Sequence, residues 1–422
     1  MQLGNLLSPG IATAIVAVIL VFSYVARHVD DAHFHKLGTL ALCGHFFVAL
    51  VVLPLLPYKW DIDKFHNYAV DIMTGVPVDP NPTVNSFAGF QSLVYTAFGA
   101  NPTIIALING LLAVLISLPI IYLARRLYPG LESRGGVFAA ILFFPLPFLF
   151  LTIPMRDALN AIIFFSLLAI IVRAYDTRNT ALALPAIPLF GMLALLRPEL
   201  AFITLGGTGA SAFVVALDRI AKKPLQTTSL SALFGVVGLI LIWLVGPKLP
   251  IAEMQGRLLH RTSGGAAYLE GMTYDSWVDL ILVTPTRALY FQFAPFPLHV
   301  SSAFDLLGAV MTPLLIILAV AGYRSARAWE TDRSILVGLT TTYLLGIVGY
   351  GLIDSNFGTT IRHRIPFTFL LVVFAAPVIE RWASSFRNWV SQRPRDYNGH
   401  DEQQRKTEKL DCGVGIRTEN AD

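Results

Sequence analysis

Long apolar runs alternate with short polar segments along most of the chain, from Gly10 to Glu380. Each run approaches the roughly 20 residues that an α-helix needs to cross the hydrocarbon core of a bilayer. The runs lack the period-two alternation of membrane β-barrel strands, so the pattern favours helices. It predicts an all-α, polytopic membrane helical bundle of about eleven transmembrane helices, near residues 8–26, 37–56, 103–124, 136–153, 157–173, 181–196, 199–217, 228–247, 303–322, 334–353 and 365–380.

Basic residues occupy every second polar gap of this pattern. Arg27 and Lys36 flank the first such gap, and arginines or lysines recur in each alternate gap up to the C-terminal segment. Because Lys and Arg accumulate in cytoplasmic loops, we expect these gaps inside the cell, with the N-terminus outside and the C-terminus cytoplasmic. No Lys or Arg precedes the first apolar run, which predicts a retained first helix rather than a cleaved signal peptide.

The composition agrees with an integral membrane protein. Hydrophobic residues make up 55% of the chain and charged residues 14%, against roughly 25% charged residues in soluble domains. The net charge of +4 comes from basic residues spread over short loops and the tail, so it does not indicate nucleic-acid binding. We expect residues 1–390 to form one transmembrane domain and the polar residues 391–422 to form a disordered cytoplasmic tail.

The remaining gaps, expected outside the cell, carry most of the side chains suited to chemistry. They comprise two long outer loops, about 57–102 and 248–302, and three short hinges. Residues 276–298 in the second loop are apolar enough to suggest a further span, but Asp279, Pro285 and Arg287 argue against it. Their aromatic side chains favour an interfacial or re-entrant segment instead.

The first outer loop opens with two carboxylates, Asp61 and Asp63, and His66 follows them. On a short helix Asp63 and His66 share a face. A carboxylate at the membrane surface can act as a general base towards an acceptor hydroxyl, or hold a divalent cation such as Mg²⁺ or Mn²⁺. An ordinary helix cap, with Lys64 as an ion-pair partner, explains the same residues.

Two hinges place an arginine and a carboxylate at the start of a helix: Arg156 with Asp157, and Arg197 with Glu199. The helix dipole favours the acid at this position but not the arginine. An arginine there suits an anion that also binds the free backbone N–H groups, so these four residues are candidates for substrate binding. A local ion pair at each hinge is the alternative.

The last outer loop holds Arg362, His363 and Arg364 directly before an apolar run. These arginines break the expected sidedness of basic residues, which is tolerated where charges line a polar cavity. Planar guanidinium groups suit a phosphate or pyrophosphate. Snorkelling to lipid headgroups is the alternative reading of the same arginines.

The second long loop contributes Arg257, Arg261 and Tyr268, which flank the pair Gly264-Gly265. Polar residues around two glycines are typical of a mobile flap over a site. A disordered connector has the same composition. We include the three side chains among the candidate substrate-binding residues.

Over about residues 57–380 the chain resembles the GT-C superfamily of integral membrane glycosyltransferases. The similarity lies in an acidic first outer loop and in several later positions: Asp61, Asp63, Phe65, Asn109, Leu127-Tyr128-Pro129, Pro145, Pro147, Arg156-Asp157 and Arg197-Pro198. Two features depart from the family pattern, because the acids follow the second span rather than the first and Ile62 separates them. Which aspartate corresponds to the family's catalytic acid therefore stays open.

The resemblance implies transfer of a sugar from a polyprenyl-phosphate donor to a glycan, lipid or protein acceptor on the non-cytoplasmic face. Asp61 or Asp63 would be the catalytic residue that takes the acceptor proton, with or without a divalent cation. The donor phosphate would meet Arg362 and Arg364, together with Arg156 or Arg197. Membrane lipids would surround the protein, and the donor would enter laterally from them.

Two other functions fit parts of the pattern. Residues 264–268, 293–297 and 358–366 also resemble envelope-polysaccharide polymerases of the O-antigen type, which join two lipid-linked oligosaccharides and need two anion sites without an essential aspartate. A lipid-linked sugar flippase or transporter usually shows inverted repeats and polar residues near the bilayer midplane. The chain has no evident internal repeat, and its polar residues gather at one face, which disfavours a transporter.

Overall fold

The computed structural model describes residues 8–56, 61–221, 243–244, 246–262, 266–300 and 303–391. These residues form helices and no strand, with one isolated β-bridge between Ala267 and Asn356. The predicted all-α fold is therefore confirmed for the described part of the chain. The predicted tail from residue 392 onwards, and most of the predicted span near 228–247, lie outside the described residues.

Eight helical stretches among the described residues are long and apolar enough to cross a membrane, which gives the chain the architecture of an integral multi-pass membrane protein. Two of them join consecutive helices, Ala32–Leu55 and Pro102–Leu127. The helices concerned are α1 (Pro9–His28), α2 (Ala32–Phe47) with a π-helical turn (Val48–Val52) and α3 (Leu53–Leu55), α6 (Pro102–Leu115) with α7 (Ser117–Leu127), α10 (Asp157–Thr177), α12 (Pro198–Ala221), α16 (Ala303–Ala328), α17 (Arg333–Ile353) and α19 (Ile365–Ser391).

Two predicted spans take a different form. The run near 136–153 is a pair of short helices, α8 (Gly135–Leu142) and α9 (Pro145–Thr152), bent by 54°. Pro145 explains the break, because proline clashes with a continuing helix and restricts the residue before it. The run near 181–196 is a 3₁₀ turn (Thr180–Ala183) followed by α11 (Ala186–Leu196), with Pro185 between them. The count of eleven spans stays a prediction.

Both long loops that were predicted to lie outside contain helices. The first holds α4 (Ile62–Thr74) and α5 (Pro82–Phe98), which pack against each other. The second holds α14 (Ile251–Thr262) and α15 (Trp277–Phe293), between 3₁₀ turns at Gly246–Lys248 and Pro297–His299. Helix α15 packs along α17, and its buried Arg287 donates a hydrogen bond of 3.1 Å to the Met272 carbonyl. A seven-residue helix, α18 (Phe357–His363), joins α17 to α19.

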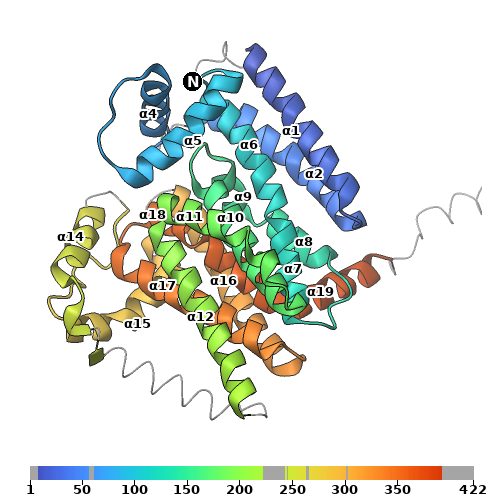
Figure 1. Ribbon diagram of the computed structural model, residues 1–422, viewed down its shortest axis with the longest axis vertical. Coiled ribbons are helices and arrows are strands. Elements are labelled where there is room, and N and C mark those ends of the chain that lie inside the picture. The colour runs from blue at the N-terminus through green and yellow to red at the C-terminus, as the bar shows by residue number, and fades with distance from the viewer. Residues whose placement is uncertain are drawn as a thin grey trace, which may run out of the picture. The chain divides into compact units, whose positions relative to one another are not determined.

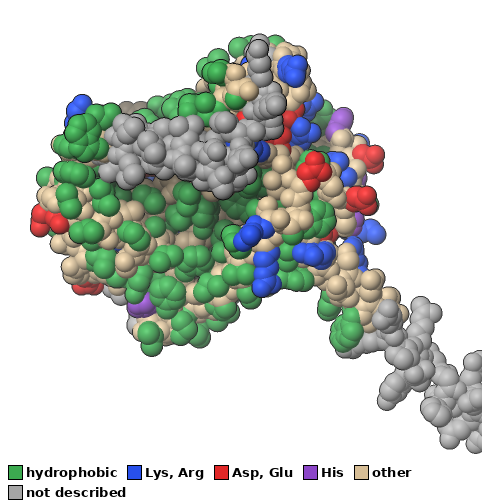
Figure 2. Space-filling view, turned by 90° about the horizontal axis from the view of Figure 1, so that it is seen from below, with side chains coloured by type: hydrophobic (Ala, Val, Ile, Leu, Met, Phe, Trp, Pro, Cys, Tyr) green, Lys and Arg blue, Asp and Glu red, His purple; other side chains and the backbone are tan. Residues whose placement is uncertain are grey.

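The compact unit of residues 1–380 has a buried centre and an apolar exterior. Every residue of α19 from Ile365 to Glu380 is buried, whereas α1 lies beside α2 at the edge of the unit (Figure 1). Large apolar side chains such as Leu20 and Phe202 stay exposed, and hydrophobic side chains cover a broad area in Figure 2. Contiguous apolar surface of this kind is costly in water and is what a helix facing lipid presents.

The contact between α12 and α17 depends on Gly207. A Cβ atom at Gly207 would lie 1.8 Å from Thr342 Oγ1 and 2.8 Å from the Gly338 carbonyl oxygen, whereas a Cβ at Gly209 would meet nothing within 4 Å. We predict that Gly207→Leu forces the two helices apart and lowers stability by about 1–3 kcal/mol. Thermal unfolding in detergent would measure the effect, with Gly209→Leu as the matched control. Equal melting temperatures for the two variants would contradict the tight approach.

Candidate active site

Charged side chains from distant segments meet at one end of the unit formed by residues 1–380. Helices α10 and α12 begin at this end, α17 finishes there, and α18 crosses it before α19 begins. The N-cap residue of α4, Asp61, reaches the same group. We call this group the charged cluster and define it by Asp61, Asp157, Arg197 and Arg362.

Asp157 is the centre of the charged cluster. Its Oδ1 accepts a hydrogen bond of 2.9 Å from Arg197 Nη2, and its Oδ2 accepts one of 2.9 Å from Arg362 Nε. The carboxylate is buried, as is Arg197. Asp157 therefore does not form the local ion pair with Arg156 considered as an alternative above. It joins three segments that are far apart in the sequence, and burial makes each partner necessary to the others.

Arg362 links the buried part of the cluster to its exposed part. Its Nη1 lies 3.6 Å from Asp61 Oδ2, and the Asp61 side chain is 60% exposed whereas that of Arg362 is 11% exposed. One guanidinium group thus contacts an enclosed carboxylate and an accessible one. An acceptor molecule could reach Asp61 from solvent while an anion approached Arg362.

Asp63 and His66 lie on the same helix as Asp61 but have other surroundings. His66 Nδ1 is 2.9 Å from the Tyr95 hydroxyl of α5. Partial burial lowers the pKa of His66, and the nearby charge of Asp63 opposes this shift. Asp63 is exposed in the first turn of α4. Of the two aspartates predicted as catalytic, Asp61 is the one that forms an ion pair with an arginine of the cluster.

A second buried carboxylate, Asp354, lies between α17 and α18. Its Oδ2 is 2.6 Å from His363 Nδ1, and its Oδ1 pairs with Arg261 of α14. The Tyr268 hydroxyl donates to the Asp354 carbonyl at 3.1 Å and is 2.9 Å from Thr360 Oγ1. Three residues predicted from the sequence, Arg261, Tyr268 and His363, therefore meet at an aspartate that the sequence analysis did not single out.

The surroundings of His363 keep its ring neutral. Burial, followed by the positive charges of Arg197, Arg261 and Arg362, holds the pKa of His363 well below its ordinary value of 6.5. A neutral ring at Asp354 donates through Nδ1 and leaves Nε2 as an acceptor. The pair of Asp354 and His363 thus resembles a histidine oriented by a carboxylate, without carrying a positive charge.

The lowered pKa of His363 predicts a loss of stability in acid. In the unfolded chain the pKa of His363 returns to about 6.5, so the ring binds a proton there at pH values where it stays neutral in the folded protein. The free energy of unfolding therefore falls as the pH drops below about 6.5. The contribution is at most about 1.4 kcal/mol for each pH unit. Melting temperatures between pH 7.5 and 5 should decline less steeply for His363→Gln than for the wild type. The exposed variant His28→Gln is the control, and equal slopes for His363→Gln and the wild type would contradict the prediction.

Arg156 and Arg364 bind backbone carbonyl groups rather than carboxylates. Arg156 Nη1 donates to the carbonyls of Thr83 and Leu196, at 3.0 and 3.1 Å, and Arg364 donates to those of Ala294 and Gln292. Burial is the main cause that lowers the pKa of Arg156 to about 10, and the same holds for Arg364, so both stay charged at neutral pH. Because Leu196 ends α11 and Ala294 follows α15, these arginines cap helix C-termini.

Two residues predicted to bind substrate, Arg257 and Glu199, form no ion pair with the residues of the charged cluster among the contacts that the structure describes. Arg257 forms a surface pair with Glu253 one turn earlier, at 2.7 Å, and both side chains are more than half exposed. Such a pair adds little energy and takes no part in the charged cluster. Glu199 is partly buried, and its charge acts on Arg156, Arg197 and Arg261. The pair Gly264-Gly265, which suggested a flap, lies outside the described residues.

Several buried polar atoms next to the cluster have no hydrogen-bond partner among the residues that the structure describes. They include both amide atoms of Asn160 and the Nε atom of Arg156. Buried polar atoms normally find a partner, so these mark where a polar ligand or water would bind. Asn160 was not predicted, although its spacing of four residues from Arg156 places both on one helix face. Asn109 holds the preceding turn, because its Nδ2 donates to the carbonyls of Ile153 and Met155 at 2.6 and 2.9 Å.

For the predicted divalent cation, the protein offers Asp61 and Asp63 as candidate ligands. Within the described ranges, no three His, Cys, Asp or Glu side chains lie close enough together to hold a metal ion. Asp61 already faces the guanidinium group of Arg362. A Mg²⁺ or Mn²⁺ ion at Asp61 and Asp63 would therefore need oxygen ligands from a substrate or from water.

Comparison with known proteins finds no relative. No protein-family model matches the chain, and no curated protein or solved structure is significantly similar to it. A function therefore has to be argued from the chain's own residues and their geometry.

Proposed function

We propose that this protein is a membrane glycosyltransferase that uses a polyprenyl-phosphate sugar as donor and acts on the non-cytoplasmic face. The observation that carries the proposal is the bridge formed by Arg362 between exposed Asp61 and buried Asp157. It places a candidate base, Asp61, 3.6 Å from a candidate phosphate-binding group, the guanidinium of Arg362. The resemblance to GT-C enzymes suggested the same two groups.

In the proposed reaction Asp61 accepts the proton of an acceptor hydroxyl. The hydroxyl oxygen attacks the anomeric carbon of the donor sugar, the bond from that carbon to the phosphate oxygen breaks, and the configuration inverts. Polyprenyl phosphate leaves with the electron pair. Arg362, held in place by Asp157, stabilises the negative charge that develops on the phosphate, and such preorganised stabilisation is usually the largest catalytic contribution.

The proposed topology has eleven spans, the N-terminus outside and the C-terminus in the cytoplasm. Its support is the placement of exposed basic residues: Arg173 and Arg219 are exposed near the C-terminal ends of α10 and α12, whereas Arg197 at the start of α12 is buried against Asp157. By the positive-inside rule the ends with Arg173 and Arg219 face the cytoplasm. The charged cluster then faces outward, where the donor can enter laterally from the lipid.

An envelope-polysaccharide polymerase is the second candidate, favoured by one specific observation. Two buried carboxylates in the described residues, Asp157 and Asp354, each pair with arginine, and so the structure offers two groups of cationic side chains. A polymerase would place the phosphates of two lipid-linked glycans there. It would not need Asp61.

The experiment that separates these functions compares charge-neutral variants. Membranes containing Asp61→Asn, Arg261→Gln or Arg362→Gln are incubated with radiolabelled polyprenyl-phosphate sugars and with lipid-linked oligosaccharides. A transferase loses its monosaccharide transfer with Asp61→Asn and Arg362→Gln. A polymerase keeps full activity with Asp61→Asn and loses chain extension with both arginine variants, which would overturn the proposal.

A further inference from the structure

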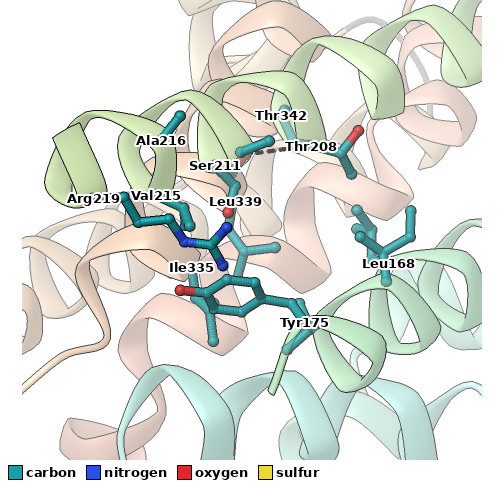
Figure 3. Close-up of a pocket in the computed structure, with 15 residues that line it drawn as sticks. Leu168, Tyr175, Thr208, Ser211, Val215, Ala216, Arg219, Ile335, Leu339 and Thr342 are labelled. Carbon is teal, nitrogen blue, oxygen red and sulfur yellow. Dashed lines mark hydrogen bonds between the residues drawn. The ribbon is translucent and has the colours of Figure 1, made fainter. Parts of the chain in front are cut away.

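A cavity of about 320 Å³ lies between α10, α12 and α17 (Figure 3). Tyr175 lines it near the C-terminal end of α10, roughly 27 Å along the helix from Asp157 at its start, by the rise of 1.5 Å per residue. Arg219 lines it near the C-terminal end of α12. The cavity therefore lies towards the opposite membrane face from the charged cluster and is a separate site.

The wall of this cavity is apolar. It is formed mainly by aliphatic side chains and alanines, such as Leu168, Leu339 and Ala216. Ser211 and two threonines also line it. The Thr208 hydroxyl donates to the Thr204 carbonyl and the Thr342 hydroxyl to the Gly338 carbonyl, each at 2.8 Å, so both threonine hydroxyls are satisfied within their own helices. A hydrocarbon chain suits such a wall, and a polar solute does not.

The mouth of the cavity carries a positive charge that no acid in the described part of the chain pairs with. Two nearby arginines are paired: Arg126 Nε lies 2.6 Å from Asp176, and Arg333 Nη1 lies 3.6 Å from Asp218. Arg219 is exposed and forms no ion pair with any residue that the structure describes. Its guanidinium group extends over the cavity beside the ring of Tyr175 (Figure 3). The site thus combines an apolar slot with a cationic entrance.

We propose that this cavity binds one hydrocarbon chain of an anionic glycerophospholipid whose phosphate meets Arg219. The apolar wall matches the chain and the free guanidinium group matches the phosphate. The volume is at the lower end of the range for small-molecule sites, which suits part of one chain rather than a whole lipid. The site is remote from Asp61 and Arg362, so the inference does not depend on the transferase function.

The test uses full-length protein in detergent and native mass spectrometry with added phosphatidylglycerol or phosphatidylcholine. We expect the wild type to retain phosphatidylglycerol in preference, Arg219→Gln to reduce that retention about fivefold, and Ala216→Phe to reduce retention of both lipids by filling the slot. Matched controls are Arg324→Gln, an exposed arginine on α16, and Ile220→Phe, a highly exposed position on α12. Both controls should bind phosphatidylglycerol like the wild type.

Three results would overturn the proposal. The first is equal retention of phosphatidylglycerol by Arg219→Gln and the wild type. The second is an equal loss of retention in Arg324→Gln and Arg219→Gln, which would show a general surface-charge effect. Preferential displacement of phosphatidylglycerol by an equimolar polyprenyl phosphate would assign the cavity to the donor lipid instead. Should Ala216→Phe fail to fold, the exposed Arg219→Gln still decides the outcome.

Discussion

Sugar transfer should fall by about 10²–10⁴-fold when Asp61 is replaced by asparagine, because this range is typical for loss of a general base. Asparagine keeps the size of the side chain and its exposure but cannot accept the acceptor's proton. Folding should be preserved, since the Asp61 side chain is largely exposed and its contact with Arg362 is a long one, 3.6 Å. Initial rates in proteoliposomes supplied with a panel of polyprenyl-phosphate sugars would measure the loss.

Asp63→Asn is the matched control for this prediction. Asp63 is on the same helix and is also exposed, but its charge acts on His66, which bonds to Tyr95 away from the cluster. We expect Asp63→Asn to retain most activity and the double variant to be no worse than Asp61→Asn alone. Full activity in the double variant, at normal expression, would rule out the proposed mechanism.

Alanine at Asp157 should have the largest effect on stability, about 3–5 kcal/mol, because it leaves Arg197 and Arg362 without their shared buried carboxylate. The loss should appear as a lower yield of monodisperse protein and a lower melting temperature in detergent. Glu253→Ala breaks an ion pair of similar length with Arg257 at the surface and should cost less than about 1 kcal/mol. A melting temperature for Asp157→Ala as high as that for Glu253→Ala would contradict the central position of Asp157.

Hydropathy predicted the helices well because lipid leaves the backbone few alternatives to a helix. The apolar runs at α1, α10 and α17 have the expected lengths. The same reasoning missed the bend between α8 and α9, which depends on proline positions within an otherwise apolar run. It also left the helices of the two long loops unspecified, because short amphipathic helices have no bilayer to set their length.

Sidedness predicted which residues could meet, but not which of them pair. Alternation of the spans placed Asp157, Arg197 and Arg362 at one end of the chain's helices, and the structure brings these three together. The choice of Arg362 over the adjacent Arg156 as partner for Asp157 depends on how α18 packs against α9 and α10. Packing between segments separated by some 200 residues leaves no local pattern to read.

Asp354 shows a different limit of sequence reasoning. It directly follows the apolar run predicted at 334–353 and is the C-cap residue of α17, so it fell in the last outer loop but was not singled out there. A carboxylate directly after Leu352 and Ile353 was the available signal, because a charge at the end of a span usually has a partner. Similarly, nothing in the sequence distinguished arginines that cap carbonyl groups, Arg156 and Arg364, from arginines free to meet a phosphate.

The most direct test of the central claim is the affinity of purified protein for a polyprenyl phosphate, the leaving product of the proposed reaction. If Arg362 binds the phosphate beside Asp61, Arg362→Gln should weaken binding about tenfold or more, whereas Asp61→Asn should strengthen it by removing a nearby negative charge. Affinities measured by microscale thermophoresis should therefore move in opposite directions. Unchanged affinity in both variants, or a loss in both, would contradict a shared site at Asp61 and Arg362.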